Sequence, residues 1–135
     1  MSVTLINPAG LPEVPVYHQV AVASGTRLVF VAGQVAWGPG GDTVGVGDLA
    51  AQVEQAYVNV GTALAGAGAG FDDVAKLTVY VVDWTPDRMP ELLAGLGRAT
   101  ERLGVKTAPP ASMIGVAALD VPEHLVEIEA TAVLA

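Results

Sequence analysis

Apolar residues recur along this chain with the periods of both helices and strands. Between residues 49 and 64 they return every three or four positions, which is the spacing of one stripe on a helix. The stripe consists of Leu49, Val53, Ala56, Val60 and Leu64. Asp48 precedes it as a suitable N-cap, and the glycine-rich stretch 66–70 follows it. We therefore predict a helix that begins after Asp48 and stops at this stretch.

A second helix is predicted between Thr85 and Gly104. Pro86 suits the first position of a helix, where no backbone N–H is needed. Glycine commonly follows the last turn, so Gly104 marks the end. The inner face is predicted to carry Leu92, Leu93, Leu96, Ala99 and Leu103.

Strand-like runs make up most of the remaining chain. Residues 74–82 are rich in β-branched side chains and are bounded by aspartates, so they predict a strand. Val3–Ile6 forms a shorter run that ends before an Asn-Pro-Ala-Gly turn. Residues 112–119 and 125–133 are predicted to finish the chain as two strands.

Residues 18–23 and 28–35 are two apolar runs that predict a β-hairpin. The four residues between them include Gly25, which can adopt the positive φ of a tight turn. The order of elements is then one strand, two strands, helix, strand, helix and two strands. Strand–helix–strand crossovers imply some parallel pairing, so we predict a single α+β domain over residues 1–135 with a mixed sheet. Two helices cover only one face of such a sheet, and a second subunit is expected to cover the other.

The composition supports a folded, associating protein. Hydrophobic residues make up 52% of the chain and charged residues 15%, which excludes disorder. This apolar surplus exceeds what one small domain usually hides, and oligomerisation would bury it. The sequence shows no run of about 18 apolar residues for a membrane span, and no secretory signal at its N-terminus. We expect a soluble, cytoplasmic protein.

The charge pattern argues against nucleic-acid partners. The formal net charge is −8, and the six Lys and Arg residues are scattered, whereas nucleic-acid binding needs a basic patch. The chain has no cysteine, and its two histidines lie far apart, so no disulfide or metal site is predicted. It also lacks a phosphate-binding or dinucleotide-binding loop. We expect no nucleic acid, no metal and no cofactor.

Several segments together resemble the RidA/YjgF family. Residues 109–119 and 126–133 resemble the end of that family, which reads Pro-Ala-Arg-Ser, a Val-rich strand and Ile-Glu-Ile-Glu-Ala. Residues 17–19 resemble its Gly-Pro-Tyr-Ser-Gln segment, and residues 30–34 resemble its Phe-Thr-Ser-Gly-Gln strand end. The resemblance covers nearly the whole chain from Val16 onward, in the family's order and spacing.

This resemblance implies a chorismate-mutase-like, RidA-like fold and a homotrimer with three clefts between neighbouring subunits. The family binds small carbonyl or imine compounds in these clefts and acts as imine or enamine deaminases. By the same match, Tyr17 lines the cleft, the backbone of Gly33 approaches the ligand, and Glu127 is the catalytic carboxylate that orients or activates water. From the residues alone, Tyr17 is also consistent with an ordinary tyrosine at an element boundary, Gly33 with a bulge, and Glu127 with a solvated strand face.

The family arginine, which grips the carboxylate of a 2-imino acid, has no counterpart in this chain. Counting back from Gly115 places Ala111 at its position, whereas matching the Pro-Ala dipeptide places Ser112 there. Neither residue is a cation, although both are expected to contact the substrate. Arg98 or Arg102 would have to reach a cleft from the second helix.

Two functions are consistent with this pattern. The first is a diverged hydrolase or deaminase of small imines, enamines or related carbonyl metabolites, with weak or no activity on 2-imino acids. The second is a non-catalytic trimer that binds a small metabolite or a protein partner. A cation and an unpaired carboxylate in the cleft would favour the enzyme.

Overall fold

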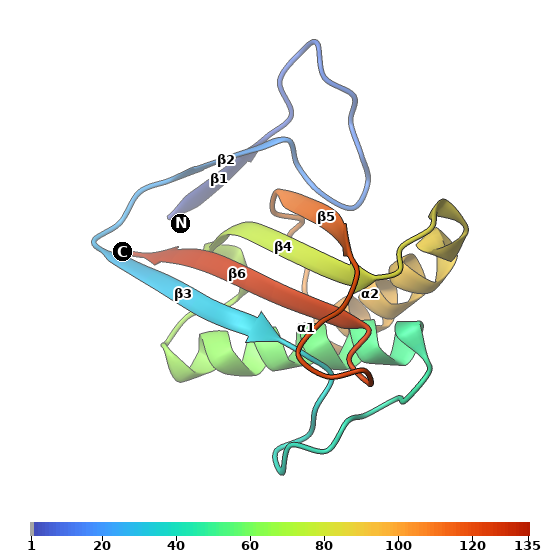
Figure 1. The fold of residues 1–135 in the computed structure, drawn as a ribbon. Coiled ribbons are helices and arrows are strands. Elements are labelled where there is room, and N and C mark those ends of the chain that lie inside the picture. The colour runs from blue at the N-terminus through green and yellow to red at the C-terminus, as the bar shows by residue number, and fades with distance from the viewer. Residues whose placement is uncertain (1) are drawn as a thin grey trace.

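The computed structural model describes residues 2–135 and has two helices packed on one face of a four-stranded sheet (Figure 1). A separate two-stranded ribbon, β1–β2, lies away from the helices. The elements in chain order are β1 (Val3–Ile6), β2 (Val20–Ala23), β3 (Arg27–Gln34), α1 (Leu49–Gly66), β4 (Val74–Val82), α2 (Met89–Leu103), β5 (Ala111–Val116) and β6 (Val126–Leu134).

The four-stranded sheet is mixed, as predicted. Its strand order is β3-β6-β4-β5, and β6 runs antiparallel to both of its neighbours. The pairing of β4 with β5 is parallel, because α2 carries the chain across one face of the sheet between these two strands. β5 therefore forms one edge of the sheet and β3 the other.

The predicted hairpin between residues 18–23 and 28–35 is wrong. β2 pairs antiparallel with β1, whereas β3 pairs with β6, the strand from the other end of the chain. Gly25 is still needed, but not for a positive φ. A Cβ at this position would collide with the backbone carbonyl oxygen of Leu134, so Gly25 allows the last strand to approach closely.

The first helix agrees with its prediction. The apolar stripe of α1 is fully buried, and the Asp48 carboxylate accepts a hydrogen bond from the Ala51 N–H at 3.0 Å. The second helix begins later than predicted. A 3₁₀ turn, Pro86–Arg88, precedes α2, and Gly104 ends α2 with a φ of 67°.

The inner face of α2 differs in part from its prediction. Leu92 and Ala99 are buried, whereas Leu93 and Leu103 remain partly exposed. Gly95, which was not predicted to face inward, is buried against α1. A Cβ on it would lie 2.5 Å from the Ala50 carbonyl oxygen, so the crossing of the two helices requires a glycine here.

The two faces of the sheet differ in character. The face under the helices is apolar and includes Leu77, Val79, Val126 and Ile128. Among residues 2–135, no helix covers the opposite face, which we call the open face (Figure 1). Across residues 2–135, none of the helices is both long and apolar enough to cross a membrane.

Candidate functional site

Polar side chains gather on the open face because buried and less buried residues alternate along residues 76–82 of β4 and 126–132 of β6. Val126, Ile128 and Ala130 of β6 point toward the helices, so Glu127 and Glu129 point the other way. The register places three polar pairs side by side across β4 and β6 on the open face. These pairs are Lys76 with Thr131, Thr78 with Glu129, and Tyr80 with Glu127.

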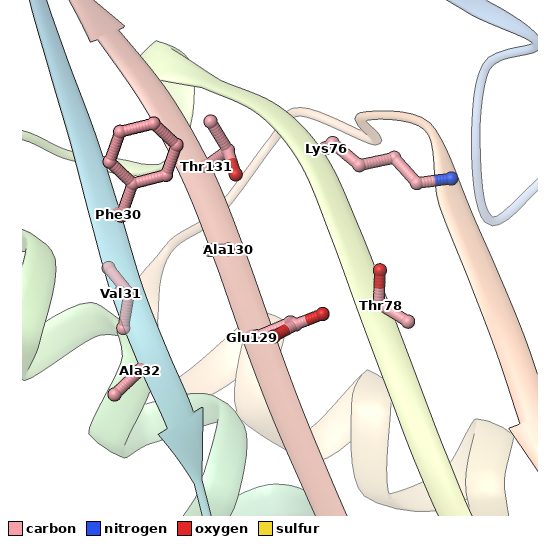
Figure 2. A pocket seen from close by; sticks show the side chains of 8 residues that line it. All are labelled: Phe30, Val31, Ala32, Lys76, Thr78, Glu129, Ala130 and Thr131. Carbon is pink, nitrogen blue, oxygen red and sulfur yellow. The ribbon is translucent and has the colours of Figure 1, made fainter.

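A hollow of about 460 Å³ lies over part of this face (Figure 2). Figure 2 shows Glu129 of β6 pointing toward Thr78 of β4, and Lys76 extending toward β5. Phe30 of β3 and Thr131 of β6 form the other side of the hollow. The hollow therefore combines one cation, one carboxylate, two hydroxyls and an aromatic ring.

Lys76 supplies a cation beside one of the two positions considered for the family arginine. Its Nζ donates a hydrogen bond to Ser112 Oγ at 2.6 Å, from the neighbouring strand. No local sequence pattern singles out Lys76, because its position next to Ser112 depends on the parallel pairing of β4 with β5. Lysine is a single point charge and cannot form the bidentate pair that arginine makes with a carboxylate.

Glu129 is held by a neighbour on the open face. The Tyr80 hydroxyl donates a hydrogen bond to Glu129 Oε1 at 2.8 Å. This bond to an ionised carboxylate, together with burial and the negative charges of Glu129 and Glu127, raises the pKa of Tyr80 above its usual value. Glu129 is thus engaged by a neighbouring side chain of the sheet.

Glu127 and Gly33, both predicted as site residues, lie in contact. A Cβ on Gly33 would be 2.5 Å from the Glu127 Cδ, so the missing side chain makes room for this carboxylate. An irregularity in the pairing of β3 with β6 just before Gln34 allows the approach. Among residues 2–135, no side-chain hydrogen bond or ion pair engages the Glu127 carboxylate.

Ala111 and Ser112, the two alternatives for the arginine position, point to opposite faces of the sheet. Ser112 pairs with Thr78 and shares the open face with Glu127. Ala111 pairs with the buried Leu77 and points toward the helices. The structure therefore brings Gly33, Ser112 and Glu127 to one side of the sheet and leaves Ala111 on the other.

Tyr17 lies in the loop before β2 and is half-buried. Its neighbour His18 binds the chain just before β5: both the backbone N–H and Nδ1 of His18 lie within hydrogen-bond distance of the Ala108 carbonyl oxygen, at 2.9 and 2.8 Å. The loop carrying Tyr17 is thereby fixed next to the segment that leads to Ala111. Tyr17 therefore lies close in the chain to a contact with the segment before β5.

Arg98 and Arg102 do not reach the open face. Both lie on α2 and pair with Glu54 of α1, at 3.7 and 3.4 Å. These are exposed pairs between helices, which contribute little to stability. In the part of the chain that the structure describes, no group of three or more His, Asp or Glu side chains is arranged to hold a metal ion.

Comparison with known proteins gives matches over most of the chain and one match over a shorter segment. The family model described as Endoribonuclease L-PSP matches residues 11–134. The RutC family protein slr0709 of Synechocystis is 34% identical over 136 residues, covering 99% of this chain and 98% of that protein. The solved structure of YyfB, a Rid family protein of unknown function from Yersinia pestis, is similar with 38% sequence identity and a TM-score of 0.88. The match covers 99% of this chain and 100% of the YyfB chain. The 2-iminobutanoate/2-iminopropanoate deaminase of Bos taurus is 33% identical over 57 residues, which are 42% of each chain.

Proposed function

Because this chain belongs to the RidA/YjgF superfamily, we propose that it is a diverged hydrolase that acts on small imine, enamine or related carbonyl metabolites. Its fold is the predicted RidA-like α+β fold, with two helices on one face of a mixed sheet. The observation that carries the proposal is the Glu127 carboxylate, which faces the open side of the sheet over Gly33 and has no side-chain hydrogen bond or ion pair among residues 2–135. The Lys76–Ser112 pair adds a cation on the same face.

In the proposed reaction, Glu127 acts as general base and then as general acid. It accepts a proton from water as the water oxygen bonds to the imine carbon. It then returns this proton to the imine nitrogen, which gives a carbinolamine. Glu127 next takes the hydroxyl proton of the carbinolamine and passes it to the nitrogen, so that the C–N bond breaks, ammonia leaves and a carbonyl compound remains. A carboxylate without a fixed partner can take both roles, and such catalysis typically contributes a factor of about 10²–10⁴.

The proposed site is completed by assembly into a homotrimer, with small molecules bound in clefts between subunits. Two large apolar side chains on the open face support this assembly: Leu28 is 63% exposed and Phe30 is 74% exposed. Neighbouring subunits would also allow Ala111, which points to the helix side of its own protomer, and Tyr17 to contribute to the same cleft.

The proposal includes weak or no activity on 2-imino acids. No arginine stands at either Ala111 or Ser112. Lys76 offers one point charge, and it already donates to Ser112. A carboxylate would therefore be held less firmly than by a bidentate arginine pair.

A non-catalytic trimer that binds a metabolite or a protein partner is the second candidate. The missing arginine favours it, because without that contact a substrate carboxylate is poorly oriented for attack by water. The Lys76 cation and the Glu127 carboxylate, which is unpaired among residues 2–135, favour the enzyme.

A screen with freshly generated imines, read by ammonia release, tests the two candidates. At least one uncharged or weakly charged imine is expected to be hydrolysed faster with the protein than without it. Glu127→Gln should lower that rate about 100-fold or more while the fold is kept. Glu101→Gln, on the exposed side of α2, is the matched control and should have wild-type activity. Equal rates for the wild type and Glu127→Gln would favour the binding module.

A further inference from the structure

A hollow of about 740 Å³ lies between α1 and the loop that follows β3. Residues 37–41 of the loop form one wall, and Gln55, Asn59 and Thr62 of α1 form the other. These three residues are spaced three or four positions apart, so they share one side of the helix. The volume falls within the range of small-molecule sites, about 300–1,000 Å³. We call it the loop–helix hollow.

The two walls of the loop–helix hollow are held together by Asn59. Its Nδ2 group donates to the backbone carbonyl oxygens of Val35 and Trp37, at 3.0 and 2.9 Å. The loop also closes on itself, because the Gly38 N–H donates to the Asp42 carbonyl oxygen at 2.9 Å. The hollow is therefore formed before a ligand arrives, which lowers the cost of binding.

Trp37 gives the hollow an aromatic surface. The residue is 40% exposed, and no hydrogen bond among residues 2–135 uses its indole N–H. Its ring meets His124 edge to face, with the centroids 6.0 Å apart and the planes at 85°, which holds the ring in one orientation. The indole thus offers an apolar ring for C–H groups of a ligand and an N–H that can donate to a hydroxyl.

The helix wall supplies hydrogen-bonding groups of both kinds. Because Asn59 uses its NH₂ group for two backbone carbonyl oxygens, its own Oδ1 accepts from Gln55 Nε2, at 2.9 Å. This bond fixes the Gln55 amide and leaves it one further N–H and a carbonyl oxygen without a partner among residues 2–135. The Thr62 hydroxyl donates to the Val58 carbonyl oxygen at 3.2 Å and keeps its lone pairs as acceptors.

We propose that the loop–helix hollow binds a neutral sugar. Among residues 2–135, every residue that lines the hollow is uncharged, although the chain has a net charge of −8. An ionic ligand would find no counter-charge there, and an anion would also be repelled. A sugar has C–H groups that fit the Trp37 ring, and hydroxyl groups that both donate to and accept from Gln55 and Thr62.

The inference does not depend on the proposed hydrolysis. In the described part of the chain, no residue lines both the loop–helix hollow and the hollow on the open face. The sugar would be bound and not cleaved, because glycoside hydrolysis usually needs two carboxyl groups and none lines this hollow among residues 2–135. Glu127→Gln should therefore leave sugar affinity unchanged, so failure of one proposal is distinguished from failure of the other.

Titration of the ¹⁵N-labelled protein with cellobiose, maltose and lactose, followed by NMR, tests the proposal. At least one of these disaccharides is expected to shift the Trp37 indole signal and the amides of residues 37–41 at millimolar concentration. Trp37→Ala removes the ring and should weaken binding about tenfold or more. Gln55→Ala removes the amide and should weaken binding about three- to tenfold. Trp84→Phe alters the other tryptophan, which lies outside the hollow, and is the control with unchanged affinity.

Three results would overturn the proposal. The first is the absence of these shifts with all three disaccharides at millimolar concentration. The second is equal affinity in the wild type, Trp37→Ala and Gln55→Ala, with their folds verified by amide spectra. The third is tighter binding of adenosine than of any disaccharide, with loss of that binding in Trp37→Ala, which would show a stacking site for a nucleobase instead.

Discussion

At the scale of single residues, the decisive feature is that Ala111 and Ser112 point to opposite faces of the sheet. Ser112 shares the open face with Glu127, and Ala111 points toward the helices. The sequence left these two alternatives for the arginine position open, because the two alignments differ by one residue. One residue in a strand reverses the direction of a side chain, so the choice decides where a substrate carboxylate would be held.

Arginine is introduced at Ala111 in one variant and at Ser112 in another. Only one of the two variants is expected to turn over a 2-imino acid faster than the wild type. The gain should be about ten- to several-hundred-fold, because a bidentate pair with the carboxylate would be restored. Measurement is by ammonia release from a freshly generated 2-imino acid. A gain in Ser112→Arg would indicate a site on the open face of one protomer. A gain in Ala111→Arg would indicate a cleft assembled from two protomers. If the wild type already matches an arginine-bearing relative, another residue holds the carboxylate, and Lys76→Met is the next variant to measure.

At the scale of elements, local pattern predicted α1 and β4 well but did not predict strand partners. The stripe of α1 and the β-branched run of β4 depend on nearby residues only, and both agree with the structure. The pairing of β3 with β6 joins strands about 100 residues apart, which no local signal records. The candidate site shows the same difference. Alternation along one strand predicts that Glu127 and Glu129 share a face, whereas the contact of Lys76 with Ser112 depends on which strands pair.

Two glycines of α2 provide a matched test of how the helices pack. A Cβ on Gly95 would press on the Ala50 carbonyl oxygen and on Val53, whereas a Cβ on Gly97 would have no neighbour within 4 Å. Gly95→Ala should therefore lower the free energy of unfolding by about 1–3 kcal/mol through overpacking. Gly97→Ala should raise it by up to about 1 kcal/mol, because alanine favours the helix. Urea denaturation of both variants measures this. Equal effects of the two substitutions would contradict the observed crossing of α1 and α2.

At the scale of the whole molecule, the uncovered face of the sheet predicts association. A monomer would expose Leu28 and Phe30 to water beside the polar hollow. Light scattering is expected to give the mass of a trimer at micromolar concentration. Phe30→Glu should shift the mass toward that of the monomer, because each interface would then bury an unpaired charge. A monomer mass for the wild type would overturn the proposed assembly and, with it, the clefts between subunits.

The whole-molecule charge leads to a prediction about RNA, which matters because the matching family model is described as an endoribonuclease. The net charge is −8, and several of the few cations are already paired: Arg98 and Arg102 lie against Glu54, and Arg88 lies against Glu91. Binding to phosphates gains most of its free energy from counterions released by a cluster of free cations.

Binding of generic single-stranded RNA is therefore expected to be negligible at physiological salt, as measured by fluorescence anisotropy of a labelled oligonucleotide. A basic single-strand-binding protein is the positive control for the labelled RNA. Detectable micromolar binding that weakens steeply with added salt would contradict the prediction, and would point to a local basic patch formed between subunits. Binding insensitive to salt would point instead to stacking of bases on exposed rings such as Phe30 and Trp37, which needs no phosphate contacts.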